Sequence, residues 1–141
     1  MQPGSAVAVA AIFVWLGMVL AISFIEAPLK FRAHGVTLPI GLGIGRLVFR
    51  ALNGCEAVLA AVVFASFVVE PPATYIAVAA AVAVVTLLAQ VLAVRPRLTR
   101  RSDSVLAGGD GPRSRAHWVY VGLEIAKVIA LLITGVLLLA T

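Results

Sequence analysis

Charged residues and cysteine are scarce in this chain. Only 12% of the 141 residues are charged, roughly half the share found in soluble domains. Hydrophobic residues make up 62%, and a soluble domain of this size cannot hide them, because it buries only about two thirds of its unfolded surface. The mean hydropathy of +1.12 agrees. The composition therefore excludes the soluble classes and predicts an integral membrane protein.

Motifs that carry enzymatic chemistry are also missing. The single Cys55 excludes an internal disulfide and vicinal-thiol chemistry, and its apolar surroundings predict a buried, inert thiol. The sequence contains no HExxH, CxxC or paired-acid motif, and no nucleophile–base arrangement is visible. Gly41, Gly43 and Gly45 lack the GxGxxG spacing of a nucleotide loop, whereas Gly41 and Gly45 fit small-xxx-small helix packing. We therefore expect no enzyme, no cofactor and no metal site.

Four apolar segments predict an all-α fold, an antiparallel four-helix bundle in the membrane. Residues 6–25 carry no charge and suffice to cross about 30 Å of hydrocarbon. The rival interpretation, a cleaved signal peptide, lacks a basic start. Pro28 is expected to end or kink the first helix, and Thr37 with Pro39 to begin the second. The expected spans are about 6–27, 47–69, 73–94 and 118–140, and the expected loops are 29–46 and 95–117.

The basic residues predict the orientation. Ten of the 11 fall in or beside the two expected loops, and none in residues 1–5, 70–74 or at Thr141. The positive-inside rule then places both loops in the cytoplasm and both termini outside. This arrangement also explains the net charge of +5 without nucleic acid. The Ala, Val and Arg usage favours a bacterial inner membrane. The arginines of the second loop are candidate contacts for anionic lipid headgroups, namely Arg97, Arg100 and Arg101.

Two ionisable residues lie deep in the fourth span. Glu124 and Lys127 are three residues apart on one helix face, and Lys127 is about 15 Å from His117 along the axis. Such residues are costly in a membrane unless they are paired. Two interpretations stay open: a self-neutralising ion pair that holds the packing, or a proton or anion site.

A second polar stripe follows the second span. Arg46, Arg50, Asn53 and Glu56 share a face, and Glu56 lies at a depth similar to that of Lys127. We therefore expect Arg50, Asn53, Glu56, Glu124 and Lys127 to form an intramembrane polar site, with Glu26 and Gln90 closing the ring. The result is a polar pocket open to the cytoplasm, or a satisfied hydrogen-bond network without a ligand.

Three short motifs resemble a known family. They are Glu26-Ala27-Pro28-Leu29-Lys30-Phe31, Gly45-Arg46-Leu47-Val48-Phe49, and Arg95-Pro96-Arg97. With the chain's layout, they resemble the small four-helix membrane proteins that include eukaryotic transmembrane protein 205. Residues 50–53 depart from that family's more aromatic, Pro-containing stretch. The resemblance implies four helices and a cytoplasmic loop, but no reaction and no catalytic residue.

Three functions are compatible with the sequence, and the first of them is the one that we predict. The first is an accessory protein that works with a protein partner or as a homo-oligomer, because four helices without an exterior domain leave little machinery for catalysis. The second is a small carrier or channel subunit that uses Glu56, Glu124 and Lys127. The third is a haem- or quinone-binding redox protein, for which His34 and His117 are the candidate ligands.

Overall fold

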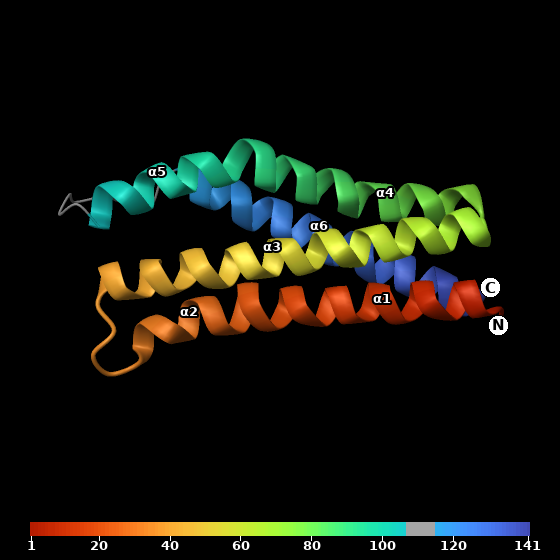
Figure 1. Ribbon diagram of the computed structural model, residues 1–141, viewed down its shortest axis with the longest axis horizontal. Coiled ribbons are helices and arrows are strands. Elements are labelled where there is room, and N and C mark those ends of the chain that lie inside the picture. The colour runs from red at the N-terminus through yellow and green to blue at the C-terminus, as the bar shows by residue number, and fades with distance from the viewer. Residues whose placement is uncertain (107–114) are drawn as a thin grey trace.

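The fold is built from long helices that lie side by side. A computed structural model describes residues 1–106 and 115–141, and these residues form helices and no strand. Figure 1 shows both chain ends at one end of the molecule and the loop of residues 33–37 at the other. Four continuous helices are long and apolar enough to cross a membrane, namely Pro3–Arg32, Leu38–Val69, Thr74–Val94 and His117–Ala140.

Two of these helices widen in the same sequence context. The first runs as α1 (Pro3–Val19), a π-helical segment η1 (Leu20–Glu26), α2 (Ala27–Leu29) and η2 (Lys30–Arg32). The third runs as α4 (Thr74–Ala89), a π-helical segment η3 (Gln90–Val94) and α5 (Arg95–Leu106). Each π segment ends two residues before a proline, Pro28 or Pro96. Because proline lacks an N–H and crowds the carbonyl four residues back, a wider preceding turn accommodates it.

This widening corrects two expectations about helix ends. Pro28 does not end the first helix, which continues to Arg32, and Pro96 lies inside a helix that continues to Leu106. The expected loop 29–46 therefore shrinks to residues 33–37, where Gly35 takes a positive φ of 82°. The expected loop 95–117 is helical over Arg95–Leu106 and again from Arg115, where α6 (Arg115–Ala140) begins.

The second long helix, α3 (Leu38–Val69), is fixed at both ends by its sequence. Thr37 is its N-cap, with Oγ1 accepting from the Ile40 N–H at 3.4 Å. At the other end, the Glu70 carboxylate accepts from the N–H groups of Gly4 and Ser5 at 3.1 and 3.0 Å. A carboxylate is stabilising there because the first N–H groups of a helix have no intrahelical partner. The residue that ends α3 thus caps α1.

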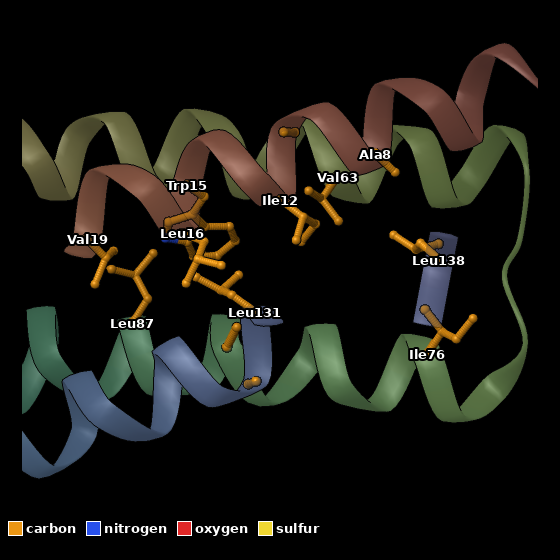
Figure 2. Close-up of a cluster of buried hydrophobic side chains, with 13 residues drawn as sticks. Ala8, Ile12, Trp15, Leu16, Val19, Val63, Ile76, Leu87, Leu131 and Leu138 are labelled. Atoms are coloured by element: carbon orange, nitrogen blue, oxygen red, sulfur yellow. The ribbon is translucent and has the colours of Figure 1, made fainter. Parts of the chain in front are cut away.

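The apolar core lies between α1, α3, α4 and α6. Figure 2 shows Ile12, Trp15 and Leu16 of α1 pointing toward Leu131 of α6. The α1 helix packs on both α3 and α6, and α4 packs mainly on α6. In the Ala-rich α4 the buried positions include Ala80 and Ala83, whose small side chains allow close helix approach.

Large apolar side chains also cover the outside of the molecule. Phe64, Val69 and Leu92 are each more than 70% exposed. A soluble protein of this size rarely exposes so much apolar surface, whereas lipid tails solvate it. The single Cys55 belongs to this outer surface and is exposed, so the expectation of a buried thiol is wrong. It lies next to the fully buried Glu56, and neighbouring positions on a helix face different directions.

The glycine series on α3 gives a stability prediction. Gly41 is buried, and a Cβ there would overlap the Phe31 ring, whereas a Cβ at Gly43 meets nothing within 4 Å. We expect Gly41→Ala to destabilise the fold by about 1–3 kcal/mol through overpacking. Gly43→Ala is the matched control and should be neutral or stabilising by up to about 1 kcal/mol, because alanine favours helix. Denaturation of both variants in detergent micelles measures the difference, and equal stability would contradict the packing.

Candidate functional site: a buried ion cluster below a basic cavity

The Lys127 ammonium is the centre of a buried polar cluster. Its Nζ lies 2.5 Å from Glu56 Oε2 and 2.6 Å from Glu124 Oε1. It also donates to Gln90 Oε1 at 2.8 Å. All four side chains are buried. One ammonium therefore contacts three acceptors. It is ion-paired with a carboxylate on α3 and one on its own helix, and it is hydrogen-bonded to the amide oxygen on η3.

The first helix joins the cluster through neutral donors. The Trp15 indole N–H donates to Glu56 Oε2 at 2.8 Å, and the Ser23 hydroxyl donates to Glu124 Oε2 at 2.8 Å. Ser23 lies in η1 and Gln90 begins η3. Both π-helical segments thus contribute a polar side chain at the level of the cluster. Such segments frequently occur at functional sites.

The charges of the cluster do not balance. Glu56 and Glu124 oppose the one ammonium of Lys127, and all three are at most 1% exposed. Taking an ion out of water costs several kcal/mol, which close pairing and hydrogen bonds offset only in part. Glu56 Oε1 is buried and has no hydrogen-bond partner among the described residues. The cluster thus has one more carboxyl group than ammonium groups, and the Glu56 Oε1 atom can accept a further hydrogen bond.

A cavity of about 940 Å³ lies between this cluster and the basic end of the molecule. Glu124 and Ser23 belong to both the cavity lining and the cluster, whereas Glu56 and Lys127 do not line it. Asn53 lines it on the α3 side. The remaining lining consists largely of apolar side chains together with basic ones. Glu124 therefore forms part of the cavity wall, although its side chain is only 1% exposed, whereas Glu56 is sealed in the core.

Aromatic rings hold two of the basic side chains that line the cavity. The Arg95 guanidinium lies 4.8 Å from the centre of the Tyr120 ring and 5.1 Å from that of Phe49. Its Nη2 donates to the Tyr120 hydroxyl at 2.9 Å. Lys30 Nζ lies 5.7 Å from the centre of the same Phe49 ring. These contacts fix the positions of both cations without neutralising their charge.

The structure brings together most of the predicted site residues. Glu56, Glu124, Lys127 and Gln90 meet in the cluster, while Arg50 and Asn53 line the cavity above it. Glu26 instead contacts Lys30 at 3.8 Å, one turn further along its own helix.

The other predicted candidates fall outside the cluster. His34 lies in the loop of residues 33–37, and His117 lines the cavity. Arg100 is exposed on α5. The side chains of Arg97 and Arg101 lie outside the part of the chain that the structure describes.

Three contributing residues escaped the sequence analysis. Trp15 carried a signal, because a buried indole N–H requires an acceptor. Ser23 carried none, since serine is common in membrane helices. Arg95 was counted only as a topology signal. The helix continues past the neighbouring Pro96, and Arg95 therefore lines the cavity.

Comparisons with known proteins give no relative. No family model matches the chain, and no curated protein or solved structure is significantly similar to it.

The different positions of Glu124, at the cavity wall, and Glu56, in the core, give a stability prediction. We expect Lys127→Met to destabilise the protein by about 3–5 kcal/mol, because it leaves buried carboxylates unpaired. Adding Glu56→Gln should restore most of this loss, since the remaining Glu124 faces the cavity and Ser23. Adding Glu124→Gln should restore less, since Glu56 stays sealed in the core. Thermal unfolding in detergent ranks the three variants, and a lone Lys127→Met as stable as the parent would contradict the cluster's structural role.

Proposed function

We propose that the chain is an antiparallel four-helix bundle in a bacterial inner membrane, with both termini outside. The proposal rests on the ten-to-zero distribution of basic residues. The end of the molecule with both chain termini carries Glu70, while Lys30, Arg46 and Arg95 line the cavity toward the other end. The cavity then opens to the cytoplasm.

A reporter fusion tests this orientation. A reporter that is active only in the cytoplasm should be active when fused after Gly109 and silent when fused at Thr141. Exchanging the two results would reverse the orientation and assign the cavity to the outer side of the membrane.

We propose further that the protein is a small carrier or channel subunit. One observation carries this proposal: Glu124 is both a member of the buried ion cluster and a lining residue of the cavity. A purely structural ion pair needs no connection to solvent. Ionisable residues inside a membrane bundle commonly mark ion or proton pathways. The cluster is thus a group of charged side chains near the middle of the bilayer, and the cavity approaches it from one side.

The charge of the cluster favours a proton as cargo, because the basic side chains of the cavity lining repel metal cations. Two carboxylates face one ammonium, and Glu56 Oε1 lies beyond Glu124 without a hydrogen-bond partner in the described part of the chain. A proton that enters through the cavity meets Glu124 first and the Glu56 carboxylate behind it. Lys127 lies between the two acids and holds them in place.

Flux into vesicles tests the carrier proposal. Purified protein in liposomes should raise proton influx above that of protein-free vesicles under a diffusion potential. Glu124→Gln should lower this flux by about tenfold, equivalent to about 1.4 kcal/mol of lost stabilisation for the moving ion. Glu26→Gln is the matched control, because Glu26 lies outside both the cluster and the cavity lining. Equal flux with and without protein would contradict the proposal.

The accessory function is the alternative proposal. Between the first and last of the long helices, the described residues outside them form the short connections 33–37 and 70–73 and α5, whose sequence is strongly polar. A protein of this kind can act through a partner in the membrane or as a homo-oligomer. Affinity purification in mild detergent distinguishes the two proposals, since an accessory protein retains a stoichiometric partner and shows no flux alone.

A further inference from the structure

The cavity carries more positive charge than its surroundings neutralise. Among the described residues, its lining includes Lys30, Arg46, Arg50 and Arg95 and one carboxylate, Glu124. That carboxylate is already engaged, with Lys127 at 2.6 Å and the Ser23 hydroxyl at 2.8 Å. Cations gathered in one recess repel each other unless an anion lies between them.

Two of these cations have no acidic partner. Arg46 pairs with Asp103 at 2.8 Å, and Lys30 has Glu26 at 3.8 Å. Among the described residues, no carboxylate lies within 4.0 Å of Arg50 or Arg95. Arg95 Nε is buried and lacks a hydrogen-bond partner there as well. Arg95 is therefore positioned by rings and a hydroxyl, with part of its donor capacity unused.

Arginine fits one class of anion better than others. Its planar guanidinium donates two parallel hydrogen bonds to phosphate or carboxylate oxygens, and phosphate recognition commonly uses it. Lys30 also lies near the Phe49 ring that contacts Arg95, so both cations border the same ring. A tetrahedral phosphate between them and Arg50 satisfies several donors at once.

The rest of the cavity fits a hydrocarbon chain. Apolar side chains form much of its lining, including Phe24, Leu42, Val91 and Trp118. Its volume of about 940 Å³ is at the upper end of pockets for drug-sized ligands, which is about 300–1,000 Å³. A phosphate alone would leave the apolar wall uncovered.

We propose that this cavity binds an anionic amphiphile with a phosphate headgroup. The headgroup lies against Arg95, Arg50 and Lys30, and an acyl chain covers the apolar wall. The site differs from the predicted headgroup contacts on α5, and it does not depend on whether the buried cluster moves an ion.

Native mass spectrometry from a non-ionic detergent tests the site. We expect phosphatidic acid to bind more tightly than phosphatidylcholine, whose choline cancels the phosphate charge. Arg95→Gln and Arg50→Gln should each weaken phosphatidic acid binding about tenfold, as expected when a charge-assisted hydrogen bond is lost. Phosphatidylcholine binding should stay unchanged in both variants. Arg50 is exposed and has no protein partner in the described region, so its variant keeps the test valid if Arg95→Gln fails to fold.

Two controls separate a built site from general attraction. Arg32→Gln removes the same charge from an exposed position that does not line the cavity, and it should leave binding unchanged. Inorganic phosphate at matched concentration should not displace the lipid. An equal loss in Arg32→Gln, unchanged binding in Arg50→Gln, or displacement by inorganic phosphate would each overturn the proposal. An absence of proton flux in liposomes would not overturn it, because the flux experiment tests Glu124 and the lipid experiment tests Arg50 and Arg95.

Discussion

The ammonium of Lys127 connects all four membrane-crossing helices. It contacts Glu56 on α3, Gln90 on η3 and Glu124 on its own α6. The two carboxylates extend the network to the first helix, through Trp15 and Ser23. A membrane offers no hydrophobic driving force between helices, so packing and interhelical hydrogen bonds fix their positions. One cation near the middle of the bundle thus specifies how four mostly apolar helices are placed.

The π-helical segments place two of the side chains in this network. Pro28 and Pro96 each follow a widened turn, and these turns carry Ser23 and Gln90. The widened turn before Pro96 accommodates this proline, so the third helix continues into α5 and places Arg95 in the cavity lining. The π-helical segments therefore position side chains of both the buried cluster and the basic cavity lining. The change from α-helical to π-helical hydrogen bonding before each proline thus affects where the polar and charged side chains lie.

The molecule has two different ends. At the end with the chain termini, the Glu70 carboxylate closes the structure by capping α1. At the other end a cavity lined by several cations leads down to Glu124. A buried acid at the wall of a one-sided cavity is the feature on which the proposed carrier function rests. The cations near the opening carry the proposed phosphate site, since Arg50 and Arg95 lack acidic partners in the described part of the chain.

The sequence by itself determined the class of the protein and much of the site. Hydropathy and length predicted the four spans, because about 30 Å of hydrocarbon demands about 20 apolar residues. Helical spacing and depth predicted that Glu56, Glu124 and Lys127 would meet, because an unpaired charge is too costly there. The tertiary structure decided the rest. Which helix supplies Trp15 or Ser23, and that a cavity reaches Glu124 but not Glu56, depend on how helices from distant parts of the chain pack. Periodicity along one helix contains no information about that packing.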